Sequence, residues 1–363
     1  MSACRGNTFS KTMPAKRSFN FWKLGELFQI TSRVLTSATK FAKFVIDFRG
    51  LIVIERASLN TAVNTRSGKI LINCPVCDFD KFTVSYEPWV IETDPGKLYG
   101  AASGIPGTQR LVTCKRCGLL YENPRFPADV IIQGYMASDD SGHDSQHAMR
   151  ADSFFRALKK LSQYLPPAGA KVLDIGTAGG AFLDAATKFG YDAWGMEPSR
   201  YLVAKGKERG VKIEQGVIEN HTFAKSSFDM VTLWDVLEHV PDPQSALTRI
   251  RELLRPGGIL LINYPDIGTW QARLAGRRFW WILSVHLQHF SPATIRKICK
   301  RTGFDAFHFQ PYWQTLEFGY LERMAIHYKI PLAALGEKLT PQFIKTMPIP
   351  YYASQTTALA RLA

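Results

Sequence analysis

The sequence predicts an α/β protein with a mostly parallel sheet, preceded by a small metal-binding domain. Short apolar runs alternate with amphipathic helical patterns from about residue 150 to residue 310, which is typical of a parallel sheet covered by helices. One of these runs, at residues 171–183, passes through closely spaced glycines into a helix, as nucleotide-binding turns do. Upstream, two C-x-x-C pairs are separated by 36 residues, which favours a metal site over disulfides.

Composition and charge narrow the class of protein. The chain of 363 residues is long enough for two domains with extensions, and its 46% hydrophobic content is typical of a globular protein. It has no uninterrupted apolar run of about 18 residues, so we expect no transmembrane helix. The net charge is +14, but residues 1–66 alone hold eleven Lys and Arg against three acidic residues. Because much of the surplus lies in this arm, we expect no nucleic-acid partner for the remainder.

We assign residues 1–66 to a basic, partly helical N-terminal extension. Apolar residues recur at helical spacing between Phe19 and Phe48, with charged residues on the opposite side. Three interpretations stay open: a helix on an anionic membrane surface, a helix packed on this protein or a partner, and an organelle transit peptide. The first would give peripheral membrane contact through residues 19–48. Because no secretory hydrophobic segment is found, we otherwise expect a reducing, cytoplasmic location.

Residues 67–138 are predicted to form a zinc ribbon. Each C-x-x-C pair follows a short apolar strand, and a tight turn that presents two thiolates supplies half of a tetrahedral site. Two such turns complete the site, with the ligands Cys74, Cys77, Cys114 and Cys117. Because all four ligands come from the protein, no coordination position stays open for a substrate, and the zinc is expected to be structural.

The remaining residues, 139–363, are assigned to one α/β domain that begins with a polar linker. The first strand is expected at 172–175, within the run that leads into the glycines. Further strands are expected at 191–196, 211–214, 228–234, 259–263 and 304–309, with a final antiparallel strand at 356–361. Helices are expected at 154–165, 182–189, 199–209, 244–254 and 292–302. The aromatic-rich segment 311–352 is predicted to be an insertion that covers the acceptor pocket.

The glycine-rich turn after the first strand carries the main functional signal. Asp174 stands at the end of that strand, and the small residues Gly176, Ala178 and Gly180 allow backbone amides to approach a ligand. A carboxylate before the turn would repel a pyrophosphate but suits a cation or ribose hydroxyls. This favours S-adenosylmethionine over NAD as the ligand. Glu197 ends the next strand, 23 residues after Asp174, and fits a ribose-binding acid.

Four segments together resemble the core of the class I S-adenosylmethionine-dependent methyltransferases. They are LDIGTAGG (173–180), GMEPS (195–199), FDMVTLWDVLEHVPDP (228–243) and LLRPGGILLINYP (253–265). The resemblance implies a Rossmann-like sheet of seven mostly parallel strands. The segments CGLLYENPRFP (117–127) and HLQHFSPATI (286–295) are similar, more narrowly, to members with an N-terminal zinc ribbon.

The resemblance also implies roles for individual residues. Asp174 and the backbone of Gly176, Ala178 and Gly180 would cradle the methionine moiety of the cofactor, and Glu197 would bind its ribose. Further along the chain, the adenine would lie between Val217 and Ile218, and the acceptor would meet the methyl group beside Asp235.

One position departs from the family pattern. The turn of the family more often reads G-x-G-x-G, and its middle position here is Ala178. Because alanine disfavours a positive φ angle, we expect the turn to differ at this residue, with Gly179 compensating.

The segment after the fourth strand holds the candidate catalytic groups. Asp235, Glu238 and His239 stand at i, i+3 and i+4, so a short helix would place them on one face. They resemble the Glu…Glu-His arrangement of the ubiquinone-pathway O-methyltransferases, in which a divalent cation assists. His239 would then be a general base or, with the two carboxylates, a Mg²⁺ ligand. The alternative is that Glu238 and His239 only brace the chain. His289 is expected either to line the acceptor pocket or to be a structural histidine.

Three hypotheses of function follow. The first is direct SN2 transfer of a methyl group from S-adenosylmethionine to a small molecule, at a hydroxyl of a saccharide, lipid or secondary metabolite. The second is an RNA base methyltransferase, which the absence of an N-P-P-Y-type tetrapeptide after the fourth strand disfavours. The third is a non-catalytic zinc-containing adaptor that keeps the fold but binds no cofactor. The sequence leaves the acceptor and the oligomeric state open.

Overall fold

The computed structural model describes residues 43–46, 51–56, 59–64, 68–89, 94, 98–99, 109–136, 146–327, 336 and 339–363. The chain divides into two units, residues 1–61 and residues 62–363. For residues 43–64 only the course of the backbone is described. Among all these described residues, no helix combines the length and the apolar character needed to cross a membrane.

The described part of the first unit consists of strands, not of a helix. Strand β1 (Lys43–Ile46) pairs antiparallel with β2 (Leu51–Arg56), and β3 (Leu59–Asn64) follows. The expectation that Lys43–Ile46 ends an amphipathic helix is therefore wrong. The physical reason is that both segments are rich in β-branched and aromatic residues, which favour extended backbone once they pair. The rest of the expected helix, residues 19–42 and 47–48, lies outside the described residues.

The predicted ribbon region is a small antiparallel sheet. The region contains β5 (Phe82–Tyr86), β6 (Leu111–Cys114), β7 (Leu120–Glu122), helix α3 (Ala128–Met136) and the short β4 (Lys69–Ile70), which pairs with β3 in a different sheet. Strands β5, β6 and β7 pair antiparallel in that order, and the fourth strand of their sheet, β13 (Gln288–His289), comes from far along the chain. The ribbon and the α/β region thus share a sheet and belong to one unit.

The seven-stranded α/β sheet is confirmed. Its strand order is β10-β9-β8-β11-β12-β15-β14. The five strands from β10 to β12 run parallel to one another, and β15 runs antiparallel to both of its neighbours. Its members are β8 (Lys171–Ile175), β9 (Asp192–Glu197), β10 (Lys212–Gln215), β11 (Phe228–Trp234), β12 (Leu254–Pro265), β14 (Phe304–Glu317) and β15 (Pro348–Leu362).

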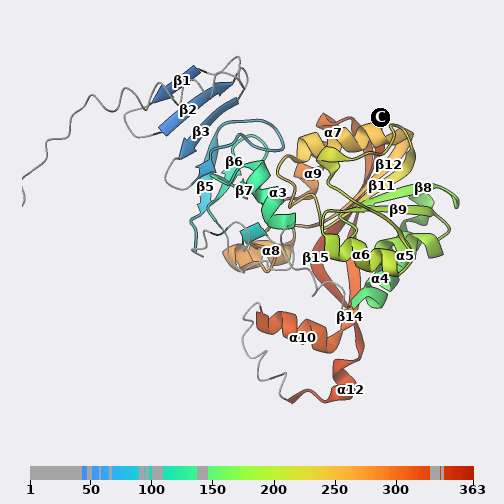
Figure 1. The fold of residues 1–363 in the computed structure, drawn as a ribbon. Coiled ribbons are helices and arrows are strands. Elements are labelled where there is room, and N and C mark those ends of the chain that lie inside the picture. Colours follow the sequence, from blue (N-terminus) through green and yellow to red (C-terminus); the bar gives the residue numbers. More distant parts are fainter. Residues whose placement is uncertain are drawn as a thin grey trace, which may run out of the picture. The chain divides into compact units, whose positions relative to one another are not determined.

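Helices cover both faces of this sheet. Figure 1 shows α4 (His147–Leu161), α5 (Ala181–Lys188) and α6 (Arg200–Glu208) on one face, and α7 (Pro243–Leu253) and α9 (Pro292–Arg301) on the other. Side chains alternate between the two faces of a strand. Val172 and Met230 accordingly pack with residues of α4 and α5, whereas Leu173 and Val231 pack with residues of α7 and α9. Burial on both faces explains why these strands are continuous apolar runs in the sequence.

The C-terminal part is a long hairpin. Strands β14 and β15 pair antiparallel from Phe304↔Leu362 to Glu317↔Pro348, so both ends of the predicted insertion 311–352 belong to strands. Helices α10 (Phe318–His327) and α12 (Gln342–Lys345) lie at the tip of the hairpin (Figure 1). Helix α8 (Trp270–Ala275) and three 3₁₀ turns, at 162–164, 218–220 and 276–278, complete the described helices.

Candidate active site

The candidate active site lies at the carboxyl ends of β8, β9 and β11. The chain continues from β8 to β9 and β10 on one side, then returns to β11 and β12 on the other. The sheet therefore has a topological switch point between β8 and β11, and ligands of open α/β sheets bind in the crevice at such a point. Asp174, Glu197 and Asp235, all predicted from the sequence, stand at or next to these strand ends.

Backbone hydrogen bonds hold the turn between β8 and α5 against β9. The amides of Gly176 and Thr177 both donate to the carbonyl of Met196, at 2.8 and 3.2 Å. Gly176 has a φ of +67°, and a Cβ at this position would come within 2.6 Å of Val236. Glycine is therefore required there for its backbone angle and for space. The turn leads through Gly180 into the N-terminus of α5, and a helix N-terminus of this kind favours a ligand's polar groups.

Ala178 adopts a φ of +49°, the region that alanine was expected to avoid. The premise that alanine avoids a positive φ here is therefore wrong, and Gly179 is not among the residues with positive φ. The amide of Ala178 donates to Glu197 Oε2 at 2.9 Å. This charge-assisted hydrogen bond helps to hold alanine in a conformation that it rarely adopts. Ala178 therefore carries the backbone strain of this turn.

Replacing Ala178 by glycine is expected to raise the free energy of unfolding by up to about 1 kcal/mol. An alanine in the left-handed conformation costs about 1–2 kcal/mol, and the change removes this cost. Part of the gain is lost because glycine raises the conformational entropy of the unfolded chain. Urea denaturation measures the difference. The control, Ala185→Gly inside α5, is expected to lower stability by about 1 kcal/mol. A loss of stability in both variants would contradict the strain at Ala178.

Glu197 joins the glycine turn to the loop before α6. The side chain is 2% exposed. Its Oε2 accepts from the amide of Ala178, and its Oε1 accepts from the amide of Ser199 at 2.9 Å. Ser199 in turn caps α6, because its side chain accepts from the amide of Leu202. The carboxylate is thus fixed in orientation at the end of β9, where α/β nucleotide sites bind a ribose.

Asp174 is a buried carboxyl group whose ionised form a nearby positive charge would stabilise. Thr232 Oγ1, on the neighbouring strand β11, donates to Asp174 Oδ1 at 2.6 Å. Burial raises the pKa of Asp174 to about 7, and the hydrogen bond from Thr232 opposes part of this shift. A positive charge placed nearby would lower that pKa and favour the carboxylate. The site is therefore suited to a positively charged ligand, in agreement with the choice of S-adenosylmethionine over NAD.

Asp235 is held at the end of β11 by two amide side chains. Asn263 Nδ2 donates to Asp235 Oδ1 at 2.8 Å, and Gln355 Nε2 lies 2.7 Å from both carboxylate oxygens. Gln314 donates to Gln355 Oε1 and so fixes the orientation of that amide. The backbone of Asp235 has a φ of +56°. Burial raises the pKa of Asp235 to about 6, against the opposing hydrogen bonds from Gln355 and Asn263.

Glu238 and His239 lie in a turn and not on the short helix that the spacing suggests. The amide of His239 donates to the carbonyl of Val236 at 2.9 Å, and no helix forms among the described residues 235–242. Glu238 is 2% exposed, and burial together with the charge of Asp235 raises its pKa well above the ordinary value. Burial lowers the pKa of His239 to about 4, so its ring is neutral at physiological pH.

A second segment brings two more histidines to this turn. The ring centroids of His239 and His286 are 4.8 Å apart, and those of His286 and His289 are 6.1 Å apart. His289, in β13, is 4% exposed, and its Nε2 has no hydrogen-bond partner. Burial lowers the pKa of His289 to about 4 and that of His286 well below its ordinary value. The structure therefore groups Glu238 and His239 with His286, while Asp235 is held by Asn263 and Gln355.

The two residues predicted to flank the adenine follow β10. Ile218 begins a 3₁₀ turn and is buried in the core on the side of α7 and α9. Val217 is half-buried, with extended backbone. Their contact with an adenine stays a prediction.

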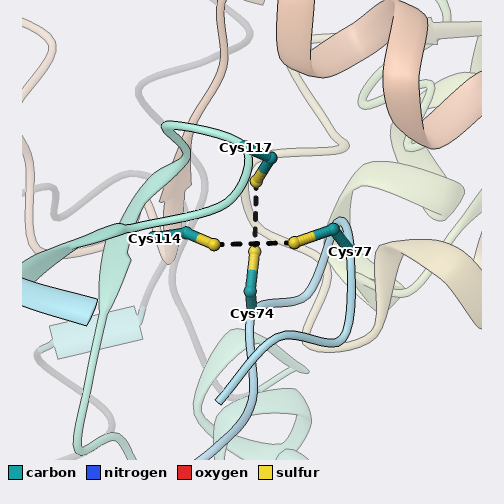
Figure 2. Close-up of side chains that lie close together, drawn as sticks. All are labelled: Cys74, Cys77, Cys114 and Cys117. Atoms are coloured by element: carbon teal, nitrogen blue, oxygen red, sulfur yellow. Dashed lines mark hydrogen bonds between the residues drawn. The ribbon is translucent and has the colours of Figure 1, made fainter. Parts of the chain in front are cut away.

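The four cysteines fit a zinc ion. Figure 2 shows their sulfur atoms pointing toward one common centre. The Sγ atoms of Cys74 and Cys117 are 3.4 Å apart, those of Cys77 and Cys114 are 3.5 Å apart, and all four lie within 4.8 Å of one another. Tetrahedral coordination with Zn–S bonds of about 2.3 Å needs sulfur atoms about 3.8 Å apart. The arrangement agrees with a closed, structural site.

Several functional neighbours have no signal in the sequence. Asn263 ends the apolar run of β12, so its place beside Asp235 could have been found from the parallel register. Gln355 reaches Asp235 from 120 residues away, and no spacing rule links His286 to His239. Only the packing of β15 and of the 285–289 segment brings these groups together.

The strand order and the acidic residues at the ends of β8 and β9 define an α/β domain suited to S-adenosylmethionine. Residues 145–308 match the family model described as a methyltransferase domain. This part of the chain is therefore a methyltransferase domain, similar to those of S-adenosylmethionine-dependent enzymes.

Several curated relatives share one name. The ubiquinone biosynthesis O-methyltransferase of Xanthomonas axonopodis pv. citri is 34% identical over 113 residues, which cover 29% of this chain and 47% of the relative. The protein of the same name from Vibrio atlanticus is 39% identical over 98 residues, covering 25% and 41%. The chain therefore spans less than half the length of these relatives. A solved S-adenosylmethionine-dependent methyltransferase of Thermotoga maritima is 21% identical with a TM-score of 0.41, covering 60% of this chain and 91% of that one.

Proposed function

We propose that this protein transfers a methyl group from S-adenosylmethionine to a hydroxyl of a small molecule. The observation that carries the proposal is Asp235: a carboxyl group at the switch point, fixed by two amides, with a pKa of about 6. A general base works best when its pKa lies near the operating pH. The printed name of the curated relatives, an O-methyltransferase, supports an oxygen acceptor.

The cofactor would be held by residues on three strand ends. Glu197 would accept the ribose hydroxyls, Asp174 would face positive charge, and the backbone from Gly176 to Gly180 would line the methionine moiety. Bound there, S-adenosylmethionine supplies the activated methyl group of its sulfonium. The protein's task is then to align the acceptor and to take its proton.

Asp235 would accept that proton. As the acceptor oxygen forms its bond to the methyl carbon, the carbon–sulfur bond breaks and the hydroxyl proton passes to the carboxylate of Asp235. Glu238 is unsuited to this role because its raised pKa keeps it protonated, and His239 because its pKa of about 4 makes it a weak base. A Mg²⁺ ion shared by Asp235, Glu238 and His239 is also disfavoured, since the possible ligand atoms of these three residues do not all lie within 4.8 Å of one another.

Calorimetry with S-adenosylmethionine tests the cofactor site. The wild type is expected to bind, and Glu197→Ala is expected to bind about 100-fold more weakly or worse, because each hydrogen bond to a charged group contributes about 1.5–3 kcal/mol. Glu208→Ala is the matched control, since this exposed glutamate on α6 pairs with Lys205 on the surface. An absence of binding heat in the wild type would favour the non-catalytic adaptor instead.

The acceptor class is tested with methyl-labelled cofactor and a cell extract. We expect the label in small molecules, of which the saccharide, lipid and secondary-metabolite fractions are counted separately. Label recovered in RNA would contradict the proposal and revive the base-methyltransferase hypothesis.

A further inference from the structure

The turn after β11 and the segment before β13 form a cluster of three potential metal ligands. Glu238, His239 and His286 each offer one ligand atom, and these atoms all lie within 4.8 Å of one another. Glu238 is 2% exposed and His286 is 4% exposed. The cluster is separate from the four cysteines, which form the other such group among the described residues.

The hydrogen bonds of the two histidines leave the same nitrogen available on each ring. His239 Nδ1 lies 3.0 Å from the carbonyl of Val285, and His286 Nδ1 lies 2.7 Å from the carbonyl of Trp281. Because a carbonyl only accepts, Nδ1 carries the proton in both rings, and Nε2 of a neutral ring keeps its lone pair. Histidines that bind a metal through Nε2 are oriented by this kind of Nδ1–H bond to a backbone carbonyl.

The carboxyl group of Glu238 has no hydrogen-bond partner. Both of its side-chain oxygens are buried, and neither makes a hydrogen bond within the described residues. An unpaired buried carboxyl group is costly, and proteins pair such groups or use them to coordinate a metal. Each of the three residues thus offers one ligand atom within 4.8 Å of those of the other two. A cation would satisfy all three groups at once, whereas a single proton would satisfy one.

The segments that carry these ligands are fixed to each other. The amide of Leu287 donates to the carbonyl of Glu238 at 2.9 Å. Gln288 Nε2 donates to the carbonyls of Leu237 and Val240, at 2.9 and 2.7 Å. The three ligands are therefore held in place before any ion binds, which favours a defined coordination geometry.

We infer that Glu238, His239 and His286 bind one divalent transition-metal ion such as Zn²⁺ or Mn²⁺. Two imidazoles and one carboxylate suit these ions, whereas Mg²⁺ prefers oxygen ligands. The set differs from the Asp235–Glu238–His239 set that the sequence spacing suggests. Three protein ligands leave a coordination position open, as in catalytic zinc sites. A role of this open position in binding the acceptor oxygen rests on the proposed function. The binding of the ion itself does not depend on that function.

Mn²⁺ titration of the full-length, zinc-loaded protein, followed by electron paramagnetic resonance, tests this site. Manganese is chosen because it favours carboxylate and imidazole ligands and competes poorly for four thiolates. The wild type is expected to bind Mn²⁺ at a single site. Glu238→Gln and His286→Ala are expected to weaken this binding more than about tenfold, the least effect seen on removing even an outer hydrogen bond of a metal site.

Two control variants separate this site from its alternatives. Asp235→Asn and His308→Ala, a histidine on β14 that stacks on Tyr164, are expected to bind Mn²⁺ like the wild type. Circular dichroism shows that each variant is folded. A failure of the wild type to bind S-adenosylmethionine in calorimetry would count against the proposed function, not against the metal site. The inference is overturned if the wild type binds no Mn²⁺, or if binding survives in Glu238→Gln and is lost in Asp235→Asn.

Discussion

Replacing Cys114 by serine is expected to remove the ribbon zinc and to lower the melting temperature of the chain markedly. Structural zinc sites of this type contribute about 10–16 kcal/mol of binding free energy at neutral pH, and the loss of one thiolate leaves an incomplete site. Zinc content by mass spectrometry and thermal denaturation measure the two effects. The control is Cys299→Ala, a buried core cysteine of α9 that is not part of the four-cysteine ligand group; this variant is expected to keep its zinc.

The loss of the ribbon zinc in Cys114→Ser is also expected to destabilise the segment that carries the histidines of the active site. Strand β7 pairs with β13 through His289↔Leu120, and the amide of Glu122 donates to the carbonyl of Leu287 at 2.8 Å. Arg125 of the ribbon also donates to the carbonyl of Pro241. Hydrogen exchange in the segment 286–289 should therefore accelerate in Cys114→Ser. Unchanged exchange there, after the zinc has been lost, would contradict this coupling.

Replacing Asp235 by asparagine is expected to lower kcat by about 10²–10⁴-fold, the usual contribution of a positioned general base. The binding of S-adenosylmethionine should be preserved, because asparagine has nearly the same shape and Glu197 and Asp174 remain. The measurement is the rate of transfer of labelled methyl groups to the acceptor found in the extract. The control is Asp229→Asn, at the other end of β11 and away from the switch point. The carboxylate of Asp229 accepts hydrogen bonds from the backbone amide of Lys171 and from the side chain of Arg255.

The pH dependence of the same rate gives a second test of Asp235. A base must be deprotonated to accept a proton, so activity is present above its pKa and lost below it. With the pKa of Asp235 at about 6, the rate should fall about tenfold per pH unit below pH 6. The residual rate of Asp235→Asn should lack this acid limb. An acid limb that persists in the variant would assign the base to another residue.

The sequence by itself determined the succession of strands and helices along the α/β region and the residues at the strand ends. The alternating apolar runs and the glycines near residue 176 specify local backbone structure through interactions between neighbouring residues. They can therefore be interpreted without tertiary information. The same holds for the two C-x-x-C turns, whose geometry is local, and for Asp174 and Glu197, whose position follows from the strand that each one ends.

Only the tertiary structure decided what surrounds Asp235 and what completes the cluster at Glu238. Gln355 and His286 arrive from strands and loops that pair through long-range packing, which no periodicity in the sequence records. The angle at Ala178 was also set from outside the turn, by the carboxylate of Glu197 that bonds its amide. The glycine-rich turn was readable in the sequence because its shape is local. Its alanine was misjudged because the partner that offsets the strain lies on the next strand.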